Sequence, residues 1–420
     1  MSVVTITAET PLDFDRFVMR TELRPVYQPI VDLTEGDVVG FEALARWPNL
    51  SGATPDVVFG AAQANGRVRD LDWACRLAAL EDALAFGLGK HHVLFVNVEP
   101  ETLGSAPPPG AELTIAAADA GLRVMLELTE RSLASHPAEL LRLVDWARAN
   151  GWGIALDDVG AEPASLALLP LLAPDVIKLD VTLVTQRPNA DQAAIMSAVM
   201  AHSECTGAVV LAEGVETQAH LDQALALGAT LGQGWLFGRP GALVRSSPPR
   251  REITFARPSG AASATPFALV SEDRQLRVGR KGLLLDLCLH IENEGLHVWP
   301  APVVLAAFQT AERFTPATAR RYTALAVHCP LVAALGVDLR TESAPGVLGN
   351  SLRATDPLAE EWTVAVVGPH YSAALIARDL GDTGPDHDRR FQFAVTYNRE
   401  LVLGAARSLM ARITTRKSDE

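Results

Sequence analysis

The stretch Gly153-Ile154-Ala155-Leu156-Asp157-Asp158 is an apolar run that ends in two adjacent carboxylates. Its apolar residues do not alternate with polar ones, which predicts a strand that is buried on both faces, as in a parallel sheet. Other short runs in the first 245 residues have the same character. They lie at residues 93–96, 124–126, 176–179 and 209–212.

Amphipathic helical patterns stand between these runs, at residues 137–150, 191–202 and 217–227. Repeated strand-then-helix units predict parallel strands with helical crossovers. About 230 residues is the size of one (β/α)8 TIM-like barrel, which is the fold we expect. A doubly wound parallel sheet is the alternative that the pattern leaves open.

A polar or charged residue stands at the carboxyl end of each run. In a parallel barrel these ends meet at one mouth, where active sites are built. So many carboxylates need compensating charge, and oxygen ligands without thiols or clustered histidines favour magnesium or manganese over zinc or copper. Each residue alone could instead cap a helix or end a strand in solvent. The residues are Asn97, Glu127, Asp157, Asp158, Lys178, Asp180 and Glu213.

The chain has 420 residues, which predicts two or three domains. The clearest change in composition lies where Ser246-Ser247-Pro248-Pro249-Arg250-Arg251 is followed by Pro258-Ser259-Gly260-Ala261-Ala262-Ser263. Such residues break helices and bury little, so we expect a linker there. The predicted organisation is a first domain at 1–245, a linker at 246–265 and a second domain at 266–420.

The overall charge and the apolar pattern exclude two classes of partner. Lys and Arg number 36 and Asp and Glu number 50, a formal net charge of −14, which argues against DNA binding through a basic surface. No apolar run approaches the roughly 18 residues of a membrane helix, and the first residues do not resemble a secretion signal. We therefore expect a cytoplasmic protein with no membrane span.

Together with their flanking residues, these strand ends resemble the EAL family of bacterial cyclic di-GMP phosphodiesterases. The likeness spans residues 17–240 and includes the signature Glu42-Ala43-Leu44. The other motifs stand in the family's order: Tyr27-Gln28-Pro29-Ile30, Phe95-Val96-Asn97-Val98-Glu99-Pro100, Leu126-Glu127-Leu128-Thr129-Glu130, Asp157-Asp158, Lys178-Leu179-Asp180, Ala212-Glu213-Gly214-Val215-Glu216-Thr217 and Gln233-Gly234-Trp235-Leu236-Phe237-Gly238-Arg239-Pro240.

The resemblance implies an enzyme that hydrolyses cyclic di-GMP to linear pGpG with two Mg²⁺ or Mn²⁺ ions. Two such cations, about 3.5–4 Å apart, lower the pKa of a bridging water and neutralise phosphate oxygens. By this likeness the metal ligands are Glu42, Asn97, Glu127, Asp157, Asp158 and Glu213.

The other site residues also follow from the resemblance. Lys178 would orient the attacking water, and either Glu213 or Asp180 would accept its proton, a choice that the sequence leaves open. Positions that hold the substrate, or that lie beside the water and metal site, are matched by Gln28, Leu44, Arg46 and Gln233.

One loop departs from the family pattern, which continues after the paired aspartates with Phe, Gly, a small residue, Gly, an aromatic and two serines. Here the run is Val159-Gly160-Ala161-Glu162-Pro163-Ala164-Ser165. Glu162 replaces a glycine and Pro163 pushes it toward extended geometry, so the loop cannot have the usual conformation. Glu130, which matches the glutamate that braces this loop and which we count with the catalytic residues, is present. We expect an active enzyme with a differently gated loop; the alternative is a receptor that binds cyclic di-GMP with little or no turnover and signals through the second domain.

The second domain resembles the DICT sensory domain, with a smaller α/β or α+β fold. The resemblance implies that this domain senses an unknown small-molecule or protein signal and regulates the barrel. A homodimer through the EAL domain is also implied, and a change in how two barrels pair would be the route of regulation. The alternative is a domain that only tethers the enzyme. The residues that carry the likeness are His290-Ile291-Glu292-Asn293-Glu294, Val304-Leu305-Ala306-Ala307-Phe308-Gln309, Pro357-Leu358-Ala359-Glu360-Glu361-Trp362 and Asp388-Arg389-Arg390-Phe391.

Overall fold

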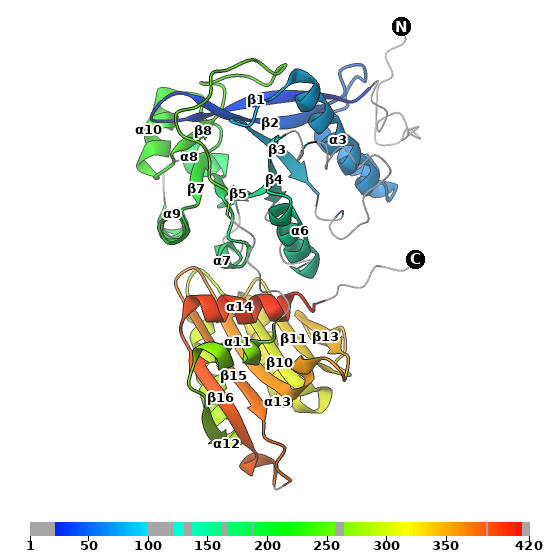
Figure 1. The fold of residues 1–420 in the computed structure, drawn as a ribbon, viewed down its shortest axis with the longest axis vertical. Coiled ribbons are helices and arrows are strands. Elements are labelled where there is room, and N and C mark those ends of the chain that lie inside the picture. The colour runs from blue at the N-terminus through cyan, green and yellow to red at the C-terminus, as the bar shows by residue number, and fades with distance from the viewer. Residues whose placement is uncertain are drawn as a thin grey trace.

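The computed structural model describes residues 22–99, 102, 117, 121–129, 137–161, 166–186, 189–256, 264–383 and 385–413. They form a barrel with surrounding helices and a second domain built on one large sheet, joined where helix α14 faces helices α6 and α7 (Figure 1). Among the described helices, none has the length and apolar character that a membrane crossing requires.

The predicted TIM-like barrel is confirmed, and the strands and helices expected between residues 93 and 227 are all present. The strands are β1 (Arg24–Asp32), β2 (Val38–Arg46), β3 (Val93–Val98), β4 (Arg123–Thr129), β5 (Gly153–Val159), β6 (Val176–Leu179), β7 (Val209–Ala212) and β8 (Leu231–Gln233). The helices are α2 (Pro55–Ala64), α3 (Val68–Phe86), α6 (Pro137–Ala149), α7 (Leu169–Leu172), α8 (Val181–Thr185), α9 (Ala190–Thr206) and α10 (Gln218–Ala226).

Strand β1 makes the barrel mixed, because it runs antiparallel to both of its neighbours, β2 and β8. The tight turn after it explains this direction. The carboxylate of Asp32 accepts hydrogen bonds from the backbone amides of Thr34 and Glu35, and Gly36 adopts φ 73°. The chain therefore reverses at once into β2, whereas β2 to β8 are parallel in sequence order.

The end of the barrel opposite the carboxyl ends of its parallel strands is filled by apolar side chains, some of which come from the segment predicted as a linker. Ile253 is buried among the inward-facing residues of the strands, and Phe255 packs against the same cluster. The backbone amide of Ala256 donates to the carboxylate of Asp175, which fixes the segment. Ile253 thus packs with the barrel although it lies within the predicted linker, and burial of an isoleucine stabilises the fold by about 2 kcal/mol.

The second domain is a three-layer α/β structure. Its helices are α11 (Pro266–Asp273), α12 (Lys281–Gly295), α13 (Pro316–His328) and α14 (Arg399–Met410), and its 3₁₀ turns are η3 (Ala311–Arg313), η4 (Pro357–Glu360) and η5 (Asp386–Asp388). The strands are β9 (Arg277–Arg280), β10 (Val303–Thr310), β11 (Val332–Val337), β12 (Glu342–Ala344), β13 (Val347–Leu352), β14 (Glu361–Val367), β15 (Ser372–Asp379) and β16 (Arg390–Thr396), in the sheet order β12-β13-β11-β10-β14-β15-β16-β9.

Alternate residues of the central strands pack on opposite faces of this sheet. On β10, Val304, Ala306 and Phe308 join the core beneath α12 and α13. Val303, Leu305 and Ala307 join the core beneath α11 and α14. Because both faces are covered, the strand is apolar throughout.

Helix α14 belongs to both domains. One side packs on β14 and β15, and the helix also contacts α6 and α7 of the barrel (Figure 1). Its Arg407 donates from Nε to the backbone oxygen of Leu171 at 2.8 Å. A cavity of about 400 Å³ remains at this boundary, lined by His202 of α9 and Arg399 of α14 among others.

His202 predicts a pH dependence of stability. Its ring is buried, neither ring nitrogen has a hydrogen-bond partner, and burial together with the charge of Arg399 lowers the pKa of His202 to about 4. Other charged groups lining this cavity are Arg142, Asp145, Glu400 and Arg407.

Between pH 6.5 and 4 the unfolded chain binds a proton at this histidine and the folded chain does not. The free energy of unfolding therefore decreases as the pH falls below 6.5. At pH 5 the loss from His202 is about 2 kcal/mol. In urea unfolding, His202→Gln should reduce the drop in midpoint between pH 7 and pH 5, whereas His328→Gln, at an exposed histidine, should not. Equal pH dependence in wild type and His202→Gln would contradict this assignment.

Candidate functional site

The ammonium of Lys178 is the centre of a buried ionic cluster at the mouth of the barrel. It lies 2.7 Å from Glu127 Oε1, 2.9 Å from Asp157 Oδ1, 2.9 Å from Glu213 Oε1 and 3.8 Å from Glu42 Oε2. These carboxylates come from β4, β5, the end of β7 and β2, and the Lys178 side chain is 1% exposed. The mouth thus brings together four of the charged residues predicted from the strand ends, Glu127, Asp157, Lys178 and Glu213.

Amides hold the carboxylate of Glu42 in place. Asn97 Nδ2 donates to Glu42 Oε1 at 3.2 Å, and Gln233 Nε2 donates to Glu42 Oε2 at 2.6 Å. Gln233 Nε2 also lies 3.3 Å from Gln28 Oε1, and Gln28 donates to the backbone oxygen of Gly238 at 3.2 Å. Antiparallel β1 makes this possible, since it pairs Gln28 with Glu42 and Ile30 with Gln233.

One lysine does not balance the acidic groups around it. Burial raises the pKa of Glu127 well above its usual value, with Glu42 and Asp157 adding to the effect, and burial raises the pKa of Glu213 to about 8. Burial alone would lower the pKa of Lys178, but its carboxylate neighbours raise it well above the usual value. Glu127 Oε2 is buried with no hydrogen-bond partner. Excess negative charge and an unpartnered oxygen are what a cation site presents.

Three carboxylates in this mouth also have the geometry of a metal site. One oxygen from each of Asp157, Asp158 and Glu213 lies within 4.8 Å of the other two, the one such group among the described residues. Asp158 has φ 56°, a conformation uncommon for a residue with a side chain. It follows the buried Asp157 but is itself exposed. The residues therefore fit divalent cations with oxygen ligands.

A cavity of about 320 Å³ opens beside Glu42 and Asn97 and includes Leu44 and Arg46. Arg46 donates from Nη1 to the backbone oxygen of Ala45 at 2.8 Å. The substrate-binding residues predicted on the second strand thus line one space that is continuous with the acidic cluster.

Asp72 and Arg76 also line this cavity, and our sequence reasoning missed them. They form a buried ion pair on α3, and the carboxylate of Asp72 further accepts from the hydroxyl of Thr102 at 2.8 Å and from the amide of Glu99 at 3.2 Å. An acid and a base four residues apart on this helix were the available signal.

Two known protein families match separate parts of this chain. The chain matches the EAL domain over residues 13–240, more than half of its length. This chain belongs to the EAL family. Residues 268–380 match the DICT domain, described as a sensory domain in diguanylate cyclases and two-component systems. An EAL domain is therefore followed by a C-terminal DICT domain.

Two curated relatives each match about half of this chain. The cyclic di-GMP phosphodiesterase RocR of Pseudomonas aeruginosa is 34% identical over 242 residues, covering 56% of this chain and 62% of RocR. The probable cyclic di-GMP phosphodiesterase PdeB of Escherichia coli is 30% identical over 219 residues, covering 51% of this chain and 42% of PdeB. The chain thus spans less than two thirds of either relative.

A solved structure similar to this chain is BlrP1 of Klebsiella pneumoniae in a complex with manganese and cyclic di-GMP. It is 33% identical, with a TM-score of 0.47, and the match covers 52% of this chain and 56% of that one.

Some predicted residues of the EAL domain lie away from the cluster or outside the described residues. Asp180 caps α8, where its carboxylate accepts a hydrogen bond from the amide of Thr182 at 2.8 Å. Glu130 and the departing loop residues Glu162–Ser165 lie outside the described residues. In the second domain, the histidines at 290, 297, 328 and 370 are exposed.

The cluster predicts how substitutions change cation binding. Asp157→Asn and Glu213→Gln each remove a charge from the carboxylate group, and should weaken Mn²⁺ binding to the full-length protein by at least roughly tenfold, since even outer-shell changes cost that much. Glu216→Gln, which removes an exposed charge three residues from Glu213, is the matched control and should bind as wild type. Calorimetric titration measures the affinities, and equal affinity in Asp157→Asn and wild type would contradict the metal assignment.

Proposed function

We propose that the EAL domain hydrolyses one phosphodiester bond of cyclic di-GMP, giving linear pGpG, and that the DICT domain regulates this activity. The single observation that carries the proposal is the Lys178 cluster, in which carboxylates from four strands surround one ammonium. Family membership and the names of the relatives supply the substrate.

Under this proposal Glu42, Asn97, Glu127, Asp157, Asp158 and Glu213 hold two Mg²⁺ or Mn²⁺ ions. Such ions, when bound, supply charge neutralisation at the phosphate and a water of lowered pKa. Lys178 orients the water that attacks phosphorus. Of the two candidate proton acceptors, Glu213 is favoured, because its carboxylate contacts Lys178 whereas the carboxylate of Asp180 is used to cap α8.

Binding of the substrate is assigned to the cavity beside Glu42. Arg46 offers a planar fork of donors to a phosphate, and Leu44 supplies apolar contact. The buried Asp72–Arg76 pair stiffens the wall opposite, since its ionic and hydrogen bonds tie α3 to the segment after β3. Gln28 and Gln233 act as positioning residues that orient Glu42.

The activity of three proteins tests this proposal. Full-length wild type with Mn²⁺ or Mg²⁺ should convert cyclic di-GMP to pGpG, and Ca²⁺ should inhibit because it prefers longer distances and more ligands. Glu42→Ala should lose turnover, whereas Arg46→Ala should chiefly raise KM. Chromatography identifies the product. Wild-type turnover in Glu42→Ala would contradict the assignment of Glu42.

The alternative function is a receptor that binds cyclic di-GMP with negligible turnover. Glu162 and Pro163, which depart from the family's loop, favour this reading. The same assay separates the two functions: binding of cyclic di-GMP with no pGpG formed in Mn²⁺, over a wide range of protein concentration, would support the receptor.

We assign regulation to the contact between α14 and α7. Helix α7 is the next α-helix after β5, the strand that carries Asp157 and Asp158. Because Arg407 binds the backbone of α7, a shift of α14 would bias the segment that follows the two aspartates. The homodimer implied by the family resemblance stays a prediction, and a change in barrel pairing could act together with this contact within one chain.

Substitutions of two arginines in the C-terminal region test whether regulation acts through the contact between α14 and α7. Arg407→Ala should lower the turnover number roughly fivefold, as an ordinary coupling free energy of about 1 kcal/mol implies, with Mn²⁺ affinity unchanged. Arg412→Ala is the matched control, because Arg412 pairs with Asp356 inside the second domain at 2.9 Å. If both variants keep wild-type turnover, the second domain tethers the enzyme rather than regulating it through this contact.

A further inference from the structure

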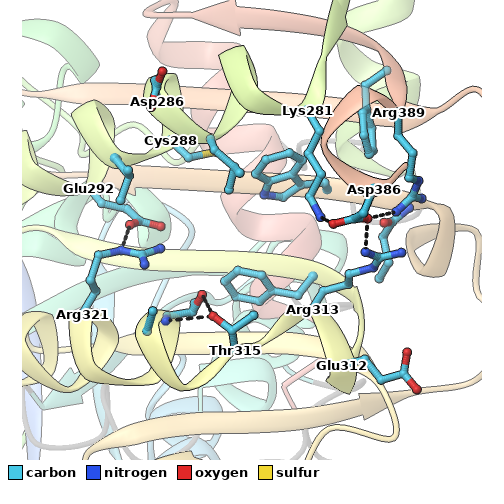
Figure 2. Close-up of a pocket in the computed structure, with 18 residues that line it drawn as sticks. Lys281, Asp286, Cys288, Glu292, Glu312, Arg313, Thr315, Arg321, Asp386 and Arg389 are labelled. Carbon is cyan, nitrogen blue, oxygen red and sulfur yellow. Dashed lines mark hydrogen bonds and ion pairs between the residues drawn. The ribbon is translucent and has the colours of Figure 1, made fainter. Parts of the chain in front are cut away.

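The DICT domain contains a cavity that lies far from the EAL site and to which no role has been given above. It has a volume of about 540 Å³, within the range of roughly 300–1,000 Å³ typical of ligand sites. Figure 2 shows it between α12 and the segment that leads into α13, over one face of the sheet. Helix α14 covers the opposite face of the sheet.

Three cations from separate elements converge on one carboxylate at one end of this cavity. Lys281 of α12, Arg313 of η3 and Arg389 all pair with Asp386 (Figure 2). Arg389 also pairs with Asp379. Three positive groups therefore face two carboxylates, and this end keeps an excess of positive charge.

Asp386 itself is not a fixed part of the wall. It sits on the short turn η5, and its side chain is 54% exposed. Glu312, the other carboxylate labelled near this end, points away from the three cations, and Asp286 lies toward the opposite end beside Cys288 (Figure 2). Asp386 is therefore positioned like a replaceable anion in a site formed by Lys281, Arg313 and Arg389.

Aromatic rings form the wall next to these cations. Phe308, Trp362 and Phe391 line the cavity, and the rings of Trp362 and Phe391 meet edge to face at 5.6 Å. Arg389 Cζ lies 5.4 Å from the centre of the Phe391 ring, which joins the cationic end to the aromatic wall. Such a wall favours a flat, apolar ring in the ligand.

The opposite end is polar but balanced. Arg321 Nε lies 2.9 Å from Glu292 Oε2, and the Glu292 side chain is 3% exposed. The hydroxyls of Thr315 and Thr318 lie 3.0 Å apart nearby on the same wall. This end can accept a neutral hydrogen-bonding group.

Two other kinds of chemistry do not fit the cavity. The acids that line it are not among the groups of described residues close enough to hold a metal ion. Burial raises the pKa of the Cys288 thiol well above its usual value, which disfavours the reactive thiolate form of this sulfur.

We propose that this cavity binds a small aromatic anion, a flat ring that carries a carboxylate or a phosphate. The anionic group is held by Lys281, Arg313 and Arg389 in place of the Asp386 carboxylate, and the ring packs on Phe308, Trp362 and Phe391. Binding therefore releases the η5 turn from the cation cluster. This inference does not depend on hydrolysis of cyclic di-GMP.

Calorimetric titration of the full-length protein, without divalent cations, tests the site with 2-naphthoate and 2-naphthyl phosphate as probes. At least one should bind, and the tighter of the two identifies a carboxylate or a phosphate as the preferred group. Three control probes should bind at least roughly tenfold more weakly. The neutral 2-naphthamide lacks the anionic group, and acetate and inorganic phosphate lack the aromatic ring.

Substitutions with opposite expected effects locate the site. Arg313→Ala should weaken binding of the better probe roughly tenfold, and Asp386→Asn should strengthen it roughly fivefold by removing the competing carboxylate. Arg412→Ala and Asp356→Asn are the matched controls, because these residues pair with each other at 2.9 Å without lining the cavity, and both should bind as wild type.

The proposal is overturned if neither anionic probe binds, if 2-naphthamide binds as tightly as 2-naphthoate, or if Arg313→Ala and Asp386→Asn both bind as wild type. Because the binding test uses no cyclic di-GMP, a failure of the probes to bind does not change the result expected from the phosphodiesterase assay. Failure of that assay likewise leaves the binding test intact.

Discussion

The ammonium of Lys178 lies 2.7–2.9 Å from carboxylates that belong to three other strands, and it is almost completely buried. Removing one partner from such a buried ionic group costs about 3–5 kcal/mol, because the remaining charge is left without solvent or partner. The barrel must therefore close with every strand in register. The same arrangement leaves more acid than base at the mouth, so the cluster that specifies the register also creates a site for cations.

The barrel interior has a polar end, which contains the Lys178 cluster, and an apolar end. Toward the mouth, Gln28 and Gln233 from antiparallel neighbours extend the polar network to Glu42. Toward the other end, Ile253 and Phe255 complete an apolar core, so a segment after the last strand belongs structurally to the barrel. Water is excluded from beneath the charged cluster, which strengthens its electrostatic interactions.

The sheet of the second domain lies between its cavity and the barrel. Alternate residues of β10 face opposite sides, with Phe308 lining the cavity and Leu305 and Ala307 in the core beneath α14. Helix α14 in turn binds α7 through Arg407. A continuous set of packed side chains thus connects the aromatic wall of the cavity to the helix that follows Asp157 and Asp158.

Sequence alone determined the barrel and most residues of its acidic mouth. Apolar runs that each end in a polar group can be recognised one at a time, and parallel strand ends must converge, so Glu127, Asp157 and Glu213 were predictable together. The antiparallel β1 and the three-residue β8 were missed, since β8 is too short to show a periodic pattern and β1 contains two prolines, which weaken a strand prediction.

Only the tertiary structure decided which partner each side chain chooses. Asp180 is two residues from Lys178, yet it caps α8. Lys178 instead lies 2.7 Å from Glu127, 51 residues earlier in the chain, and 3.8 Å from Glu42, 136 residues earlier. Ile253 fills the barrel from within a stretch whose composition predicts a linker, and the DICT cavity joins Lys281 to Arg389 across more than a hundred residues. These contacts depend on chain closure over long separations, which local composition and periodicity do not encode.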